Sequence, residues 1–397
     1  MKKGWEYRSF KDVFPIKMGK TPPRGDSSSW DKTKVTSNRW VSIADISINE
    51  GKIIDDTKEY ITDKAAEKIN LVKAGSLLMS FKLSIGRMAF AGVDLYTNEA
   101  IIAIPKNEDY DLKFLYYYLL QYDWRTLTEG NEKVKGATLN KQSIGKIKLP
   151  VISSAEQRRI VSYLDSSFDL IDKIKENASK SLSEAKALFQ SALAEAMEPK
   201  EGWEEKTLGE IATDMYRGSG IKRDQISQIG FPCVRYGEIY TTYNYSFNEC
   251  VSHTNESLIN PKKYFDKGDI LFAITGESVE DIGKCIAYTG KERCLCGGDI
   301  VVMKHNQYPQ FLAYALSTKE AIRQKGLGKV KLKVVHTNVP ALKSIKIYLP
   351  TDIKVQQQIV SRLDSLSSKV RAIEEKYQKM IAECEALKQA MLREVFE

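Results

Sequence analysis

An internal repeat limits the possible folds of this chain more than any other feature. Six motifs of the first half return in the same order in the second half. Such an ordered set predicts two copies of one scaffold, and the small variation in their offset predicts loops of different length. The paired motifs are Gly4-Trp5-Glu6 and Gly202-Trp203-Glu204, Val72–Leu78 and Phe265–Leu271, Gly86–Ala89 and Gly283–Ile286, Phe114-Leu115 and Phe311-Leu312, Leu149-Pro150 and Leu349-Pro350, and Gln157-x-x-Ile160-Val161-Ser162-x-Leu164-Asp165 and Gln356-x-x-Ile359-Val360-Ser361-x-Leu363-Asp364.

Each copy begins with a part of about 150 residues that alternates short β-rich runs with Gly, Asn, Asp and Ser clusters. One helix is predicted inside each part, near residues 111–122 and 308–319. This mixture indicates an α+β domain. The predicted strands include Ile101–Ile104, Ile147–Leu149, Ile300–Met303 and Ile345–Leu349.

Each copy ends with a long helix. No Gly or Pro occurs between Ser153 and Glu198, or between Thr351 and the C-terminus. Pro150 and Pro350 precede these segments, where they cannot interrupt a helix. We therefore divide the chain into a domain at 1–152, a helix at 153–198, a second domain at 199–351 and a second helix at 352–397.

Both predicted helices carry a heptad repeat, which is typical of a coiled coil. Small residues of the first helix match large ones of the second, as at Ala178 and Tyr377, which favours packing of one helix on the other. The alternative is that each helix lies on its own domain. The predicted seam includes Ile160, Leu164, Ile171, Ile174 and Leu188 of the first helix, and Ile359, Leu363, Leu366, Val370, Ile373, Tyr377 and Leu387 of the second.

A helix of this size is roughly 65 Å long, more than one turn of DNA at about 34 Å. A rod of that length with a domain at each end is expected to act as a spacer.

The composition is that of a folded protein, with 42% hydrophobic and 28% charged residues. The sequence contains no apolar run of the roughly 18 residues that cross a membrane, and its start does not resemble a secretory signal. We expect a cytoplasmic protein without membrane contact. The net charge of +8 favours a polyanionic partner, and the positive excess falls in the two non-helical segments.

The six cysteines show no paired CxxC spacing, and three histidines are available to complete a metal site. Zinc binding through Cys294 and Cys296 stays open, but buried thiols are the favoured interpretation, so no metal site is expected.

Each domain ends in a basic stretch without Asp or Glu, over residues 133–155 and 321–351. Equivalent placement in the repeat favours a phosphate-binding edge. The alternative is a solvated strand edge protected by lysine.

Polar loop residues in both domains are candidates for contacts with bases or phosphates. Arg can bond guanine through two hydrogen bonds, and Asn can do so with adenine. For each residue taken alone, a surface ion pair or a core tyrosine is an equal alternative. The DNA-binding candidates are Lys20, Thr21, Arg24, Arg39, Lys82, Arg87, Lys133, Lys135 and Asn140 in the first domain, and Arg217, Lys222, Arg223, Arg235, Tyr236, Tyr240, Thr275, Lys329, Lys331, Lys333 and Asn338 in the second.

Catalytic motifs are missing from the sequence. It contains no GxxxxGK[ST], GxGxxG, HExxH or GxSxG motif. Asn260-Pro261 is similar to part of an adenine methyltransferase signature, but the second Pro is absent, so a turn is predicted there. No catalytic residue is expected.

The ordered, duplicated motifs resemble the specificity subunits of type I restriction-modification systems over the whole chain. The resemblance is carried by the Gly-Trp-Glu motifs, the Gly75 and Gly268 motifs, and the two Leu-Pro pairs that lead into the Gln…Leu-Asp helices. One departure is Lys354-Val355-Gln356, where the family usually has Glu-Gln, as at Glu156-Gln157.

The resemblance implies two pseudo-symmetric α+β target recognition domains and an antiparallel coiled coil that fixes the gap between two half-sites. It also implies double-stranded DNA as a ligand, together with two modification subunits and with restriction subunits as partners. S-adenosylmethionine and ATP would be bound by those partners, so this chain needs no cofactor. Adenine would be flipped out of the duplex for N6-methylation by the partners.

Three alternatives stay open on the sequence alone. The chain could serve another bipartite system, such as a type IIB enzyme, or be a coiled-coil adaptor whose domains bind proteins. An enzyme with an unrecognised site is the third. DNA binding that weakens steeply with salt distinguishes the recognition role from the adaptor.

Overall fold

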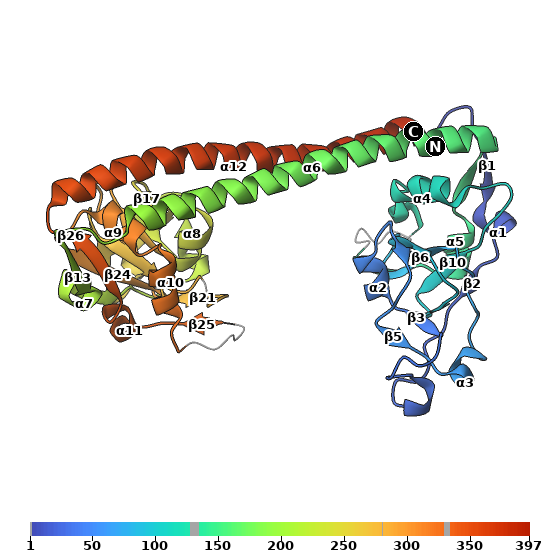
Figure 1. Cartoon of the computed structure of the whole chain (residues 1–397), viewed down its shortest axis with the longest axis horizontal. Helices are drawn as coiled ribbons and strands as arrows, with labels where there is room; N and C mark the ends of the chain where they lie inside the picture. The colour runs from blue at the N-terminus through green and yellow to red at the C-terminus, as the bar shows by residue number, and fades with distance from the viewer. Residues whose placement is uncertain (1, 128–134, 280, 329–333) are drawn as a thin grey trace. The chain divides into compact units, whose positions relative to one another are not determined.

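The computed structural model describes residues 2–127, 135–279, 281–328 and 334–397, and it divides into two compact units (Figure 1). Unit 1 comprises Met1–Ala178 and Lys379–Glu397, and unit 2 comprises Ser179–Gln378. The predicted four-part division differs from this one, because the two long helices each contribute to both units.

Unit 1 is built around a five-stranded sheet in which β6 is central and every residue is buried. Alternate side chains of β6 face opposite cores: Leu77 and Met79 contact one cluster, and Leu78 contacts another. The sheet therefore has both faces covered. Its strands, in spatial order, are β2 (Lys17–Met18), β10 (Ile101–Ile104), β6 (Leu77–Ser80), β8 (Met88–Ala91) and β4 (Ile53–Ile54).

Smaller elements of unit 1 complete these cores. A three-stranded sheet and two strand pairs flank the main sheet, and α4 supplies Phe114, Leu115 and Leu119 to the larger core. These elements are α1 (Phe10–Val13), α2 (Ile43–Ile48), α3 (Asp63–Ala66), α4 (Leu112–Leu120) and α5 (Lys141–Gly145), the sheet β5 (Glu59–Tyr60), β3 (Arg39–Val41) and β9 (Tyr96–Thr97), and the pairs β1 (Glu6–Ser9) with β12 (Lys148–Val151) and β7 (Lys82–Ser84) with β11 (Lys135–Thr138).

Unit 2 repeats this plan. Its central strand β20 sends Ile270 and Phe272 to one core and Leu271 and Ala273 to the other. The main sheet has the order β14 (Ala212–Arg217), β24 (Ile300–His305), β20 (Ile270–Ala273), β22 (Cys285–Tyr288) and β17 (Ser246–Phe247).

The smaller elements of unit 2 also match those of unit 1. The second sheet is larger, with five strands, but its three middle strands occupy the places of β5, β3 and β9. These elements are β15 (Ile226–Ser227), β18 (Ser252–Thr254), β16 (Phe231–Val234), β23 (Cys294–Cys296) and β19 (Tyr264–Phe265), the pairs β13 (Trp203–Thr207) with β26 (Lys346–Pro350) and β21 (Thr275–Gly276) with β25 (Val335–His336), and the helices α7 (Leu208–Ile211), α8 (Tyr236–Thr241), α9 (Pro309–Ala315), α10 (Lys319–Gly326) and α11 (Val339–Lys343).

Both main sheets thus follow one strand order and one pattern of neighbours, with the second strand of each half, β2 or β14, at one edge. The outer strands β4 and β17 pair in parallel with their neighbours, and the other neighbours in these sheets pair antiparallel. The expected pair of pseudo-symmetric α+β domains is therefore present.

The long helices are α6 (Ser154–Ala196) and α12 (Ile353–Phe396), close to the ranges expected from the sequence. They run antiparallel in both units (Figure 1). In unit 1, Lys175 pairs with Glu385, and Asp172 pairs with Lys388 further along α12. In unit 2, the segment Ala192–Ala196 lies beside residues 359–366. The helix pair is the expected antiparallel coiled coil.

A buried glutamine joins each long helix to its own domain. The Gln157 side chain accepts a hydrogen bond from the Asp111 N–H at 2.8 Å and donates one to the Asp109 carbonyl at 2.7 Å. Gln356 makes the equivalent bonds with the Tyr308 N–H at 3.0 Å and the Gln307 side-chain oxygen at 2.8 Å. Each amide nitrogen also donates to a carbonyl just before its helix, that of Ile152 at 3.1 Å or that of Pro350 at 2.9 Å. These contacts explain why the repeat preserves a polar residue inside the core.

The aspartate that ends the same motif accepts a hydrogen bond from a tyrosine in each unit. The hydroxyl of Tyr117 donates to Asp165 at 2.5 Å, and that of Tyr314 donates to Asp364 at 2.7 Å. Each tyrosine comes from the helix that covers the main sheet, α4 or α9. The Gln…Leu-Asp motif therefore fixes the direction in which each long helix leaves its domain.

The side chains of the predicted seam differ in burial. Ile160, Leu164, Ile171, Leu363 and Val370 are buried, and Ile359, Leu366 and Tyr377 are half-buried. Four predicted positions are exposed instead: Ile174 by 48%, Leu188 by 61%, Ile373 by 39% and Leu387 by 51%.

The register shifts because an α-helix has about 3.6 residues per turn and drifts away from a strict 3.5-residue repeat. Near the C-terminal end of α6, Phe189 and Leu193 are buried in the core of unit 2 in place of Leu188. Near the end of α12, Leu392 and Phe396 are buried in the core of unit 1. The helix α6 therefore begins on the first domain and ends in the core of unit 2. The helix α12 begins on the second domain and ends in the core of unit 1.

Candidate nucleic-acid interface

The two predicted basic stretches are placed equivalently. In unit 1, β11 follows the segment that contains Lys133 and pairs with β7, in the register Thr138 with Lys82 and Lys135 with Ser84. Lys82 and the backbone of Lys135 thus belong to one two-stranded ribbon. Lys133 lies outside the described residues.

In unit 2, the corresponding ribbon pairs β21 with β25 in the register Thr275 with His336. The Thr275 hydroxyl lies 3.1 Å from His336 Nδ1. The structure therefore brings the candidate Thr275 next to His336, in the middle of the second basic stretch. Lys329, Lys331 and Lys333 lie outside the described residues.

A loop in unit 1 forms a cavity of about 460 Å³ that is rich in cations and aromatic rings. It lies between the segment after β2 and the strand β5. Its lining residues include Arg24, Trp30, Lys32, Lys34, Lys58 and Tyr60. A cationic, aromatic hollow of this kind suits a nucleic acid, whose phosphates are anionic and whose bases stack.

Arg24 is held at the rim of this cavity. Its guanidinium carbon lies 4.2 Å from the ring centroid of Trp30 and 4.8 Å from that of Trp40. Glu59 accepts a hydrogen bond from Nη1. The two rings and the carboxylate together hold the guanidinium in place.

The loop that carries these residues is stabilised by two aspartates. Asp26 accepts from the backbone N–H and hydroxyl of Ser28 at 3.0 and 2.7 Å. Asp31 accepts from the Thr36 N–H at 2.7 Å and the Thr33 hydroxyl at 2.8 Å, and these bonds hold the pKa of Asp31 well below its usual range. Both carboxylates stay ionised and keep the loop ordered at neutral pH.

The other candidates of unit 1 vary in accessibility. Lys20 is exposed, and Thr21 donates to Glu99, which lowers the pKa of that carboxyl. Arg39 is 29% exposed and lies 3.8 Å from Asp56. Arg87 lies 3.9 Å from Glu50. Arg39 is therefore poorly placed to contact a ligand.

In unit 2, Arg217 is already occupied, since it donates to the Gly298 carbonyl and to Asp299. Lys222 and Arg223 are exposed at the start of a short 3-10 helix, Arg223–Gln225. Both are accessible to a ligand.

The remaining candidates of unit 2 lie at or near α8. Arg235 and Tyr236 are half-buried at its N-terminus, and the Tyr240 hydroxyl donates to the Asp281 carbonyl at 3.3 Å. Burial raises the pKa of Tyr240, so this hydroxyl stays protonated. The three side chains are less accessible than Lys222 and Arg223.

The two candidate asparagines have a structural role at equivalent places. Asn140 is the N-cap of α5 and accepts from the Ser143 N–H at 2.8 Å, and Asn338 is the N-cap of α11 and accepts from the Ala341 N–H at 3.0 Å. Each side-chain oxygen is therefore used inside the protein. Capping explains both residues without a base contact.

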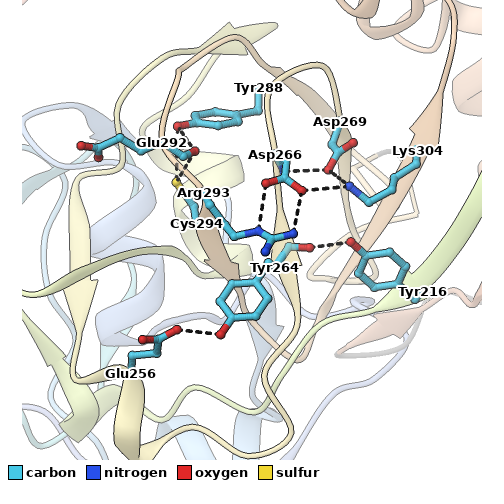
Figure 2. Close-up of polar contacts among 10 residues, drawn as sticks. All are labelled: Tyr216, Glu256, Tyr264, Asp266, Asp269, Tyr288, Glu292, Arg293, Cys294 and Lys304. Atoms are coloured by element: carbon cyan, nitrogen blue, oxygen red, sulfur yellow. Dashed lines mark hydrogen bonds and ion pairs between the residues drawn. The ribbon is translucent and has the colours of Figure 1, made fainter.

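Figure 2 shows a polar cluster of unit 2 that the sequence did not indicate. Asp266 pairs with Arg293 at 3.0 Å, and Lys304 lies 3.3 Å from Asp266 and 2.9 Å from Asp269. Burial raises the pKa of Asp269, whose carboxylate also accepts from the Asp266 N–H at 2.8 Å.

This cluster holds the turn of the repeated Gly268 motif. Gly268 has a φ of +98°, in the left-handed region that favours glycine. The matching Gly75 has a φ of +81° and lies beside Lys73, which pairs with Asp94 at 2.8 Å. The motif is thus a structural turn in both units.

The structure indicates no metal site among the residues that it describes, since none of their His, Cys, Asp and Glu side chains gather in groups of three or more. Cys294 and Cys296 are buried. Within the same part of the chain, none of the helices is long and apolar enough to cross a membrane.

Arg24 is among the residues predicted from the sequence, whereas Trp30, Trp40 and Glu59, which position it, are not. The available signal was Trp30 itself, a large aromatic residue inside a loop of Ser, Asp and Lys. A tryptophan in such a loop often marks a ligand contact or a stacking partner.

Two copies of one α+β domain, each with a long helix and with a two-stranded ribbon at an equivalent place, define a class of tandem recognition proteins built on a helical spacer. The family described as type I restriction modification DNA specificity domain matches residues 2–183 and again residues 200–382. The chain belongs to this family. It is a specificity subunit of the type I restriction-modification class.

Individual relatives agree with this assignment. The chain is 23% identical over 303 residues to the type I restriction enzyme MjaIX specificity subunit of Methanocaldococcus jannaschii, which covers 70% of this chain and 68% of that protein. A chain from a structure of a type I restriction-modification system, described in terms of complex assembly and conformational transition, has 18% identity and a TM-score of 0.75, with coverage of 100% and 98%. The HsdS subunit from Thermoanaerobacter tengcongensis has 17% identity and a TM-score of 0.52, with coverage of 100% and 97%. The two structures support the fold.

Proposed function

We propose that each globular domain reads one half of a bipartite DNA target, and that the antiparallel helices α6 and α12 set the gap between the halves. The observation that carries this proposal is the duplication of one sheet order in two units, each matched by the DNA specificity family. Two similar readers joined by stiff helices suit two half-sites separated by bases that are not read.

We infer that the chain is not itself catalytic. In the Figure 2 cluster, the carboxylates of Asp266 and Asp269 are paired with Arg293 and Lys304 and support a turn. The sequence contains none of the phosphate-loop, dinucleotide or zinc-protease motifs sought. Adenine N6-methylation and cleavage would be carried out by modification and restriction subunits, which would bind S-adenosylmethionine and ATP.

Exposed apolar side chains on the long helices support docking of such partners. In unit 1, Tyr163 is 47%, Leu170 is 62% and Ile174 is 48% exposed along α6. Exposed apolar residues that recur along one helix are typical of a protein interface. Two modification subunits, one on each half of the repeat, would follow from the duplication.

The proposal is tested by expressing the chain with its modification subunit and mapping N6-methyladenine across host DNA by single-molecule sequencing. We expect a bipartite motif with one methylated adenine in each half. Stable complex formation without new methylation would contradict the proposed role. Failure to form the complex would favour a protein-binding adaptor.

A domain exchange tests whether the two readers are independent. Replacing residues 1–150 by those of a relative with another target should change one half of the methylated motif and leave the other unchanged. A change in both halves would show that the domains do not read separately. The unexchanged half serves as the internal control.

Salt titration tests the DNA contact directly. The logarithm of the association constant should fall linearly with the logarithm of salt concentration, with a slope set by the number of phosphates contacted. Binding of the complex to DNA that does not depend on salt would contradict a phosphate interface.

A further inference from the structure

We propose that Arg24 is the side chain of the first domain that reads a guanine in its half-site. The inference deepens the proposed function and rests on it. It names one reading residue and one base, and it follows from the way in which the surroundings of Arg24 orient its guanidinium.

The guanidinium is fixed from two sides. Trp30 and Trp40 meet edge to face, with their ring centroids 5.0 Å apart, and both rings lie within 4.8 Å of the Arg24 guanidinium carbon. The rings are themselves anchored, because the Trp40 Nε1–H donates to the Lys20 carbonyl at 3.1 Å and the Trp30 Nε1–H donates to the Pro23 carbonyl at 3.0 Å. Cation–π contact with both rings restricts the position of the guanidinium.

Glu59 restricts the rotation of the guanidinium. It accepts from Nη1, which leaves the edge formed by Nε and Nη2 without an acceptor among the residues that the structure describes. This edge presents two parallel N–H donors, the arrangement that matches O6 and N7 of guanine in the major groove. The side chain is 55% exposed, so the edge is accessible to a base.

Preorganisation separates Arg24 from the other cations of the unit. Arg39 is oriented but only 29% exposed, and its Nε is buried. Lys32 is exposed, but its ammonium group lacks the planar fork that recognises guanine. Arg24 combines a guanidinium held by two rings and one carboxylate with an accessible edge, and a side chain that is already held loses less entropy on binding.

The adjacent cavity offers a binding surface for the DNA backbone next to the base that Arg24 contacts. Lys32, Lys34 and Lys58 line it together with Arg24, and Lys34 is held by the Thr57 carbonyl at 2.8 Å. These ammonium groups suit phosphate oxygens, which position a duplex without reading its sequence. Arg24 at the rim would therefore meet a base edge while the lysines contact the strand.

The reading device belongs to the first domain alone. The second half of the sequence contains a single tryptophan, Trp203, which packs against Phe311 in the core of unit 2. Since the scaffolds match and this loop does not, the loop is a place where the two half-sites acquire different sequences. Arg24 is thus a specificity-determining residue for one half-site.

The test compares the wild-type chain with Arg24→Ala, Arg24→Lys and Lys32→Ala. Each chain is used at full length and together with the partner subunits with which it purifies. The target is first selected from randomised duplexes with the wild type. Dissociation constants are then measured for duplexes that carry every single base-pair substitution in both half-sites. Circular dichroism melting confirms that each variant is folded.

We expect one G·C pair in one half-site at which the wild type discriminates by about 5- to 150-fold. Both Arg24 variants should lose this discrimination to within about twofold and keep it at every other position. Arg24→Lys is decisive, because it retains the positive charge and removes the fork. Lys32→Ala should instead weaken binding to all duplexes equally.

Two results would overturn the inference. The first is that the Arg24 variants weaken binding to every duplex by the same factor, which would make Arg24 a phosphate contact or a structural residue. The second is unchanged discrimination at all positions. Failure of the wild type to select any sequence would be distinguishable from both, and it would overturn the proposed function as well.

Discussion

Gln356 has no exposed surface, yet both ends of its amide are bonded. Its oxygen accepts from the Tyr308 N–H, and its nitrogen donates to the Gln307 side chain and the Pro350 carbonyl. An apolar residue of similar size would leave these groups without a partner in the core. The conserved position of Gln157 in unit 1 repeats this arrangement.

Replacing Gln356 by alanine should lower the free energy of unfolding of unit 2 by about 2–3 kcal/mol, because buried polar groups lose their hydrogen bonds. Urea unfolding measures the change. Gln358→Ala is the matched control, since Gln358 is exposed on the same helix and should cost within about 0.5 kcal/mol. Equal effects of the two substitutions would refute a clamping role for Gln356.

His305 should make the stability of unit 2 depend on pH. Its Nε2 is buried without a hydrogen-bond partner among the described residues, and its Nδ1 accepts from the Gln307 N–H at 3.1 Å. Burial lowers the pKa of His305 to about 4, whereas an unfolded chain has a value of about 6.5. The folded state thus binds fewer protons than the unfolded state between these values.

Stability should therefore fall as the pH decreases from about 6.5 to 4, by about 3 kcal/mol in total from this residue. Unfolding at pH 7.5, 6 and 5 measures the slope. His305→Gln removes the titrating group, so the difference between variant and wild type isolates the contribution. A parallel pH profile for both proteins would argue against a buried neutral His305.

At the scale of elements, the long helices could be predicted because nothing in 153–198 or 352–397 breaks a helix. The strands Ile101–Ile104 and Ile300–Met303 could be predicted from their β-branched residues. The seam could be predicted only in part, because Phe189 and Leu392 leave the heptad to enter the cores of the units. A local repeat carries no information about which core receives the end of a helix.

The candidate site was also predictable only in part. Polar and basic residues in loops can be recognised as candidates, as Arg24 and Lys222 were. The position of the Arg24 guanidinium depends on Trp40 and Glu59, which are brought to it by the pairing of β3 with β5. Contacts formed by tertiary pairing have no local sequence signal, so neither residue could be assigned in advance.

The end of α12 should contribute strongly to unit 1. Phe396 packs against Trp5, Phe114 and Tyr118, and it is 1% exposed. Phe396→Ala should cost about 3–5 kcal/mol through lost burial and the cavity that remains.

Tryptophan fluorescence during urea unfolding reports on this loss, because four of the five tryptophans, Trp5 among them, belong to unit 1. Leu387→Ala, at 51% exposure on the same helix, is the control and should change stability little. A loss as large for Leu387 as for Phe396 would show that the helix end is not seated in the core.

At the scale of the whole molecule, the proposed gap should follow the length of the helix pair. Inserting one heptad at facing positions of α6 and α12 adds seven residues to each helix, or about 10 Å. At 3.4 Å per base pair, the gap should lengthen by about three base pairs. Mapping the methylated motif measures this, and an unchanged gap would reject the spacer role. The same heptad inserted in α6 alone is the control, because unmatched lengths should disrupt the pairing.

Unit 1 contains both chain ends, and the Lys2 ammonium donates to the Val395 carbonyl at 2.7 Å. This has a consequence for biosynthesis. The first domain emerges from the ribosome early, but the core of unit 1 lacks Leu392 and Phe396 until more than 200 further residues have been made. At 5–20 residues per second, the wait after residue 178 is roughly 10–40 s. A stop codon that removes the residues from Lys379 onward would therefore damage the part of the protein that was made first.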